Sequence, residues 1–321
     1  MTARWVGIDE AGYGPNLGPM VISAVIAEGP DGRAPDLWGD LAATIARAGD
    51  PSDRPWVDDS KAVLRAGRGR DRLEATCLAA LAASGRELPC SLGGLLAALD
   101  AGTLADAELS PWLRDADADP ALPRPEIRAL FDRAQALRPF EGAAWRIDAV
   151  RSVVVGPARF NAGLEATGSK ARVHFAAFAR VLDAVWTRAG DGCATFVHSD
   201  KHGGRHFYYE PLLDALPDAW IDRGPEGPAL SRYVIRDASR RLELRLRPRA
   251  EADDGLVALA SIVSKTVREL WMDAFNAHWT ARLPGLRPTA GYPTDARRFR
   301  RAIEPECQAR GLDPSLWWRA K

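Results

Sequence analysis

The start of the chain places the strongest constraint on its fold. Residues 5–8 form a short apolar segment, which two adjacent carboxylates, Asp9 and Glu10, follow at once. A Gly12-Tyr13-Gly14 turn and a second apolar run over residues 20–27 come next, and this pattern predicts two strands joined by a glycine turn. Successive strand residues face opposite sides, so both carboxylates reach one site only at a strand end or a bulge. Adjacent carboxylates repel unless a cation or proton lies between them. The alternative is a solvated turn after an edge strand.

Composition excludes several classes of protein. The chain has 321 residues, 46% of them hydrophobic, which is enough for a large core. Lys plus Arg equals Asp plus Glu at 43 each, so any attraction to nucleic acid must be local. The four cysteines are widely spaced and indicate neither a zinc site nor a disulfide framework. We find no signal peptide and no apolar run near the ~20 residues of a membrane span. We therefore expect a cytoplasmic protein without membrane contact and without an evident obligate protein partner.

The rest of the chain alternates predicted strands and helices, as expected of an α/β protein. We predict strands at 151–156 and 194–200, a hairpin of 232–235 with 242–247, and helices at 37–48, 170–188 and 256–279. Between residues 85 and 148 the composition shifts to Pro, Ala and Asp. We predict a helical insertion there, with residues 1–84 and 149–321 forming the main domain.

Carboxylates at the ends of predicted strands are the candidate site residues. Asp9 and Glu10 end one strand, Asp200 ends another, and ligands of α/β sheets bind at strand ends. Glu269 lies in the long helix, four residues after Lys265 and therefore on the same face. Converging carboxylates suit Mg²⁺, and two such ions assist phosphodiester hydrolysis. The alternatives are a turn residue for Asp200 and a surface charge for Glu269.

Four motifs resemble those of one known family. They are residues 7–15 with Gly18-Pro19, then Asp59-Ser60-Lys61, residues 259–265, and Gly291-Tyr292-Pro293-Thr294. With residues 85–148 set aside, their order and spacing resemble those of type 2 ribonucleases H, the ribonuclease HII and HIII family. The resemblance implies a ribonuclease H-like fold, an α/β architecture with a mixed central sheet flanked by helices. It also implies hydrolysis of the RNA strand of RNA–DNA hybrids, with Mg²⁺ or Mn²⁺ as the cofactor.

The resemblance also implies roles for single residues. The family's four acidic metal ligands, which are its catalytic residues, correspond to Asp9, Glu10, Asp200 and Glu269. A glutamate in the fourth position is expected of the HIII branch. The conserved turn and the lysine motifs imply substrate contacts at Gly12, Tyr13, Gly14, Ser60, Lys61 and Lys265.

Two departures from the family pattern bear on specificity. The HII turn is Gly-Arg-Gly, whereas this chain has Tyr13 between the glycines. The tyrosine that reads the junction in the family, two positions before the fourth acid, corresponds to Val267. We therefore expect weak cleavage at a single embedded ribonucleotide. A related nuclease with another substrate, and an inactive module that binds nucleic acid, are the alternatives.

Substrate affinity must come from local positive charge. Two clusters of arginines could supply this charge. Each cluster either binds phosphates or pairs with acids on a solvated face. The first comprises Arg232, Arg236, Arg240, Arg241, Arg245, Arg247 and Arg249, and the second Arg297, Arg298, Arg300 and Arg301. We expect Trp317 and Trp318 to close the core.

Overall fold

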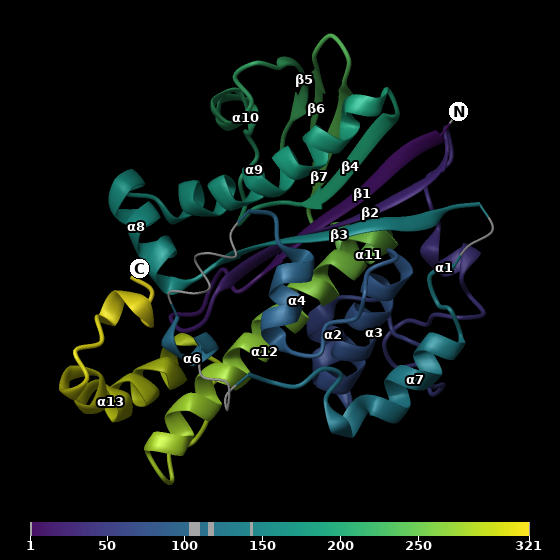
Figure 1. Ribbon diagram of the computed structural model, residues 1–321. Helices are drawn as coiled ribbons and strands as arrows, with labels where there is room; N and C mark the ends of the chain where they lie inside the picture. Colours follow the sequence, from purple (N-terminus) through teal and green to yellow (C-terminus); the bar gives the residue numbers. More distant parts are fainter. Residues whose placement is uncertain (1, 103–109, 115–118, 142–143, 321) are drawn as a thin grey trace.

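A seven-stranded mixed sheet forms the centre of the computed structural model, which describes residues 2–102, 110–114, 119–141 and 144–320 (Figure 1). The strand order is β3-β2-β1-β4-β7-β6-β5. β1, β4 and β7 run parallel, and the other neighbours are antiparallel. The predicted α/β architecture, a mixed central sheet flanked by helices, is confirmed. The strands are β1 (Thr2–Ala11), β2 (Met20–Pro30), β3 (Arg146–Val155), β4 (Ala194–Asp200), β5 (Trp220–Glu226), β6 (Ser231–Arg236) and β7 (Arg241–Arg247).

Helices cover both faces of this sheet. Figure 1 shows α9 and α10 on one side and the long α12, with α2, α3, α4 and α7, on the other. The helices are α1 (Leu37–Asp40), α2 (Ser60–Arg65), α3 (Gly69–Ala83), α4 (Leu92–Leu99), α6 (Pro111–Arg114), α7 (Arg128–Ala136), α8 (Pro157–Thr167), α9 (Lys170–Arg188), α10 (Tyr209–Ala215), α11 (Ala250–Asp253), α12 (Gly255–Arg282) and α13 (Pro293–Ala309). Short 3-10 turns are η1 (Pro125–Ile127), η2 (Ala189–Asp191) and η3 (Pro314–Leu316).

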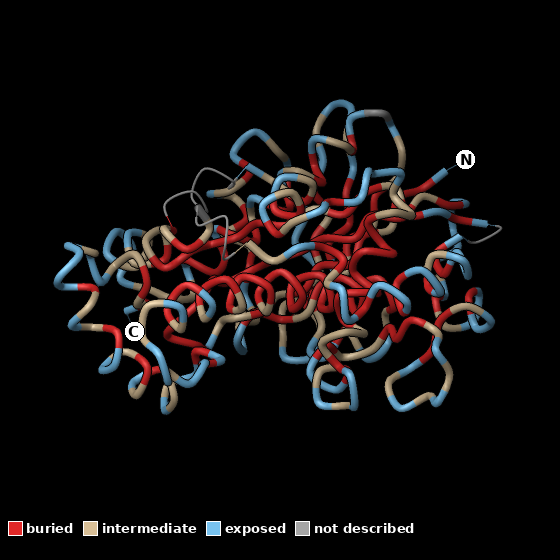
Figure 2. The backbone as a smooth tube through the Cα atoms, turned by 60° about the horizontal axis from the view of Figure 1, so that its bottom comes forward, coloured by how far each residue is buried: buried red, intermediate tan, exposed pale blue. Residues whose placement is uncertain are grey.

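The strand β2 is buried on both of its faces. Val21 and Val25 belong to the apolar cluster that includes α3 and α12. Ile22 and Ile26 belong to the cluster on the other face, which includes α9. Figure 2 shows the buried residues concentrated along the middle of the molecule. Burial on both faces is the physical reason that residues 20–27 form an unbroken apolar run.

A close approach of backbone to backbone fixes α12 against β1. A Cβ atom at Gly7 would lie 2.1 Å from the carbonyl carbon of Leu256 and 2.3 Å from the amide nitrogen of Val257. Only glycine allows this separation. Farther along α12, Ser264 Oγ donates a hydrogen bond of 3.0 Å to the carbonyl oxygen of Asp9. The contact at Gly7 therefore brings the middle of α12 beneath the carboxylate end of β1.

Most of the predicted elements are present. The helix predicted at 170–188 is α9, and the hairpin is β6 with β7. α12 extends the predicted 256–279 by one residue at its start and three at its end. The helix predicted at 37–48 is wrong beyond Asp40, because the following backbone pairs elsewhere. Ala46 N donates to the carbonyl of Pro55, and Val57 N donates to the carbonyl of Ala46.

The region of the predicted insertion shares its core with the main domain. Buried leucines of α4 and the ring of Trp112 join the cluster that includes α3 and α12. The Trp112 ring centroid lies 5.1 Å from that of Trp271 and 4.9 Å from that of Phe275. β3 starts at Arg146, so the boundary at residue 148 falls inside a strand. Residues 103–109, 115–118 and 142–143 of the region lie outside the described residues, and a separate unit here stays a prediction. Within the described part of the chain, no helix has the length and apolar character of a membrane span.

Candidate active site

A pocket of about 230 Å³ lies where β1 and β4 end, and it collects most of the residues singled out from the sequence. Asp9, Glu10 and Asp200 line it together, and Glu269 does not. Every residue predicted to contact substrate is also part of its wall. The lining residues are Asp9, Glu10, Ala11, Gly12, Tyr13, Gly14, Pro15, Asp59, Ser60, Lys61, Asp200, Glu251, Ser261, Lys265 and Tyr292.

Asp9 and Glu10 reach this pocket from the end of β1. The pairing of β1 with β2 continues without a register shift to Ala11, where β1 ends, so no bulge is involved. Asp9 is buried, with 8% of its surface exposed. The Glu10 side chain is more open, and its Oε2 lies 3.8 Å from Nε2 of His174. The strand end therefore turns two consecutive carboxylates toward one cavity.

Burial and mutual repulsion act on these carboxylates. Burial, followed by repulsion from Glu10 and Asp200, raises the pKa of Asp9 well above its ordinary value. Burial also raises the pKa of Asp200, and repulsion from Glu10 adds to it. Among the described residues, no three His, Cys, Asp or Glu side chains are gathered closely enough to hold one ion as they stand. The acids thus surround a cavity without converging on one point.

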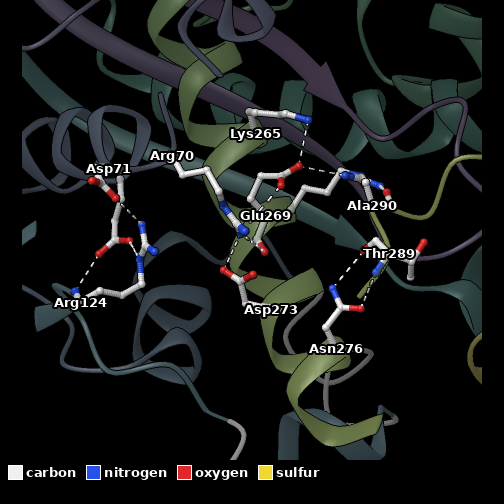
Figure 3. Close-up of polar contacts among 11 residues, drawn as sticks. Arg70, Asp71, Arg124, Lys265, Glu269, Asp273, Asn276, Thr289 and Ala290 are labelled. Atoms are coloured by element: carbon white, nitrogen blue, oxygen red, sulfur yellow. Dashed lines mark hydrogen bonds and ion pairs between the residues drawn. The ribbon is translucent and has the colours of Figure 1, made fainter. Parts of the chain in front are cut away.

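Glu269 is not part of the pocket wall, and on α12 it is surrounded by cations (Figure 3). Its Oε1 is 2.9 Å from Lys265 Nζ and 3.1 Å from Arg268 Nη1. Its Oε2 is 3.8 Å from Nη2 of Arg70, which also pairs with Asp273. Burial alone would raise the pKa of Glu269, but Lys265, Arg268 and Arg70 outweigh burial and lower it. Three of the four predicted ligands therefore line the pocket, and the ligand role of Glu269 stays a prediction.

The glycine turn has one position that requires glycine. Gly12 has a φ of +88°, and a Cβ atom there would lie 2.3 Å from the carbonyl oxygen of Pro19. Gly14 has open space around it. The Tyr13 ring between them packs edge-on against His174, with ring centroids 5.1 Å apart, and lies 4.5 Å from Lys170 Nζ. Tyr13 is thus partly held by packing while it lines the pocket.

The C-terminal segment braces this turn, which sequence reasoning missed. Arg319 donates hydrogen bonds to the carbonyl oxygens of Gly12 and Tyr13, and its side chain is buried. Arg319 N also bonds to the carbonyl of Asn16 at 2.8 Å. Trp317 is fully buried in the core cluster, as predicted, and Trp318 is partly buried against it. No local pattern in the sequence links positions about 300 residues apart.

Ser60 and Lys61 lie at the start of α2. Ser261 Oγ on α12 donates to Ser60 Oγ at 2.9 Å, and both side chains are buried. Asp59 caps α2 by accepting from Lys61 N at 2.8 Å. Lys61 is exposed at the pocket wall. Ser60 therefore holds α2 on α12, and Lys61 is the member of the motif that is free to meet a substrate.

Val267 does not occupy a position that could read a substrate. Its side chain is fully buried in the core cluster, because it lies on the face of α12 that packs into the protein. Besides Tyr13, Tyr292 lines the pocket, with 49% of its surface exposed. The correspondence between position 267 and the family's tyrosine stays a prediction, and the buried Val267 itself offers no contact to a substrate.

Glu251 is a pocket residue that the sequence analysis did not identify. It lies on α11, immediately after β7, which is the parallel neighbour of β4. Burial raises the pKa of Glu251, and repulsion from Asp200 and Asp59 adds to it. The strand-end argument that identified Asp200 would have found Glu251 if β7 had been recognised as parallel to β4.

Six of the eleven arginines in the two clusters form ion pairs with acids. Arg232 and Arg245 both bind Glu243, with contacts of 3.0 Å and 2.6 Å. Further pairs join Arg236 to Asp222, Arg240 to Asp237, Arg298 to Asp295 and Arg300 to Glu304. For these six arginines, the alternative of pairing with acids on a solvated face describes the structure.

A larger pocket of about 720 Å³ lies between α9 and α10. Its charges balance, since Arg172, Arg180 and Arg205 are matched in number by Asp183, Glu210 and Asp214. The smaller pocket has five carboxylates and two lysines in its wall. Excess negative charge, which a cation site requires, is therefore found in the smaller pocket.

Comparisons with known proteins give a similarity of fold. No protein-family profile matches the chain, and no curated protein sequence matches it. A chain of the PCNA–ribonuclease HII complex from Archaeoglobus fulgidus is 16% identical with a TM-score of 0.39, over 99% of this chain and 94% of that one. Ribonuclease H2 from Pyrococcus horikoshii OT3 is 14% identical with a TM-score of 0.45, over 98% and 92%. Bst-RNase HIII in complex with Mn²⁺ is 14% identical with a TM-score of 0.43, over 99% and 66%. Similarities at this level concern the fold alone.

Proposed function

We propose that this chain is a divalent-metal-dependent endonuclease that hydrolyses the RNA strand of RNA–DNA hybrids. The observation that carries the proposal is the pocket where β1 and β4 end, in which Asp9, Glu10 and Asp200 face one cavity. The resemblance of four sequence motifs to type 2 ribonucleases H suggests the nuclease class and the hybrid substrate, and each of these motifs contributes a residue to the pocket wall.

The donors in the pocket fit Mg²⁺ or Mn²⁺. All the acids present oxygen, which hard divalent cations prefer. Burial raises the pKa of Asp9, so its ionised form is costly without a compensating positive charge. Asp9, Glu10 and Asp200 would hold the metal, and bound metal supplies an activated water and a stabilised leaving oxygen.

Other pocket residues would orient the nucleic acid. Lys61 is exposed and offers a cation to a phosphate. Tyr13 and Tyr292 present aromatic rings at the cavity wall, where a sugar or base can stack. Backbone groups of the turn from Gly12 to Gly14 are held in place by Arg319. This arrangement would hold the backbone of a bound nucleic acid in one orientation beside the acids.

The preference for runs of ribonucleotides over a single embedded one rests on Tyr13 in the turn and on Val267, which is buried and offers no hydroxyl to a substrate. Tyr13 lacks the forked charged contacts of the arginine that the HII turn carries. A site that loses a hydrogen-bonding partner for the 2′-hydroxyl loses discrimination for it. We propose that long hybrids are cut faster than duplexes with one ribonucleotide.

A second function, binding of nucleic acid without cleavage, is favoured by one observation. Glu269 is paired with Lys265 and Arg268 and lies outside the pocket wall. With only three of the four acids of the family pattern at the cavity, a module that binds but does not cut is the competing interpretation.

One assay separates these functions. Labelled RNA–DNA hybrid, single-ribonucleotide duplex, RNA duplex and DNA duplex are each incubated with Mg²⁺, Mn²⁺ or EDTA. We expect metal-dependent cutting of the hybrid by the natural chain, none by Asp9→Asn, and unchanged cutting by Asp132→Asn, which alters an exposed acid on α7. Binding of the hybrid without cutting under any metal would support the second function instead.

A further inference from the structure

The position of α11 places one more carboxylate beside Asp200. β7 pairs in parallel with β4, so that Arg247 lies opposite Asp200 at the ends of the two strands. The chain turns at Arg249, and Ala250 N then donates to Asp200 Oδ1 at 3.4 Å. Glu251 is the next residue, and it lines the same cavity as Asp9, Glu10 and Asp200.

Glu251 is the acid of this cavity with an unsatisfied buried oxygen. Its Oε2 is shielded from solvent and has no hydrogen-bond partner among the described residues. The neighbouring acids differ, because Asp200 accepts from Ala250 N and Asp59 accepts from Lys61 N at 2.8 Å. A buried carboxylate oxygen without a partner costs free energy, and proteins pair such groups or use them to bind a metal.

Glu269 is in the opposite situation. Lys265 Nζ and Arg268 Nη1 both contact its Oε1, so its charge is already compensated inside the protein. Using Glu269 as a ligand would break these ion pairs and leave the buried Arg268 unpaired, which is costly. Among the described residues Glu251 forms no ion pair and its Oε2 accepts no hydrogen bond, so using it as a ligand leaves no buried cation of the protein without a counter-ion.

We infer that Glu251, rather than Glu269, is the fourth carboxylate of the metal site formed by Asp9, Glu10 and Asp200. The inference rests on the proposed function, since it takes that metal site as given. It assigns a ligand role to a residue outside the four acids of the family resemblance. The class of ligand is a hard divalent cation, Mg²⁺ or Mn²⁺, because every donor is a carboxylate oxygen.

Direct measurement of Mn²⁺ binding tests the assignment without reference to activity. The full metal-free chain is titrated with Mn²⁺, and free ion is measured by electron paramagnetic resonance. We expect Glu251→Gln to weaken Mn²⁺ binding by about tenfold or more, at least the effect typical of residues that only support a ligand. The matched control is Asp253→Asn, which removes the same charge from the same short helix at an exposed position outside the pocket wall. It should bind Mn²⁺ as the natural chain does.

The outcomes separate this inference from the proposed function. If Asp9→Asn binds Mn²⁺ as well as the natural chain does, the metal site itself is wrong. If Asp9→Asn loses binding while Glu251→Gln matches Asp253→Asn, only the assignment of Glu251 is overturned. Circular dichroism verifies that each variant folds. If Glu251→Gln does not fold, Glu251→Ala, which removes the carboxylate altogether, is titrated in its place.

Discussion

Replacing Gly7 by alanine should separate β1 from α12 and destabilise the protein strongly. The added Cβ would meet three backbone atoms, the carbonyl carbon and oxygen of Leu256 and the amide nitrogen of Val257, at 2.1, 2.5 and 2.3 Å. Backbone atoms cannot rotate away as a side chain does. Restoring ordinary contact at ~3.5 Å requires the strand and the helix to part by roughly 1.4 Å, which forfeits much of the dispersion attraction between them.

The magnitude follows from this separation. Inserting a methyl group into a packed core costs ~1–3 kcal/mol and sometimes more, and here the neighbours cannot move independently, so we expect about 3–5 kcal/mol. For a chain of this size that corresponds to a melting temperature lower by roughly 4–8 °C. Urea denaturation gives the free energy of unfolding, and a thermal melt gives the temperature. The control is Gly14→Ala, which adds a methyl group in open space at the pocket. A Gly7→Ala melting temperature within ~2 °C of that control would refute the reasoning.

Three further predictions concern the site. Asp9→Asn should stabilise the metal-free protein at neutral pH by about 1–2 kcal/mol. The pKa of Asp9 is higher in the folded than in the unfolded protein, so ionisation of Asp9 destabilises the fold, and this cost is fully present above the folded pKa. That difference should shrink on acidification in urea melts, and a difference independent of pH would contradict it. Glu269→Gln should destabilise by roughly 3 kcal/mol at neutral pH, since Lys265 and the buried Arg268 lose their counter-ion. The folded pKa of Glu269 is lowered, so its contribution to the stability of the protein is present above the unfolded pKa and is lost as the pH falls through the folded pKa. A Glu269→Gln variant as stable as the natural chain at neutral pH would refute this prediction. Tyr13→Ala should change the ranking of long hybrid against single-ribonucleotide duplex more than Val267→Ala does, measured as the ratio of initial rates, and the reverse order would return the specificity role to α12.

The pocket residues that could be predicted from the sequence are those that follow from local sequence patterns. Asp9, Glu10 and Asp200 were identified because each ends a strand with a clear apolar pattern, and the parallel pairing of β1 with β4 brings such ends together. The helices α9 and α12 were predictable from their long apolar stripes. The helix predicted at 37–48 failed because pairing between Ala46 and residues 55–57 replaces it, and such pairing leaves no local signal.

The remainder of the site depends on contacts between distant segments. Glu269 is paired with Arg70 of α3, about 200 positions earlier, and the turn at Gly12 is held by Arg319, about 300 positions later. Burial of Val267 likewise follows from the face of α12 that meets the core. Periodicity gives the face of a helix that is buried, but it does not identify the charged residues that a second element brings to the other face.

The surroundings of Asp9 and Asp200 and those of Glu269 therefore differ in their balance of charge, and this difference decides where a cation can bind. Around Asp9 and Asp200, burial and like charge raise the pKa values, so added positive charge relieves an existing cost. Around Glu269, Lys265, Arg268 and Arg70 already provide that charge, and a metal ion would meet repulsion from them. Lys265 belongs to both surroundings, because it lines the pocket while its Nζ contacts Glu269. An ion bound by Asp9 and Asp200 would repel this ammonium group and strengthen its pairing with Glu269, so metal binding at the pocket should hold Glu269 more firmly outside the site.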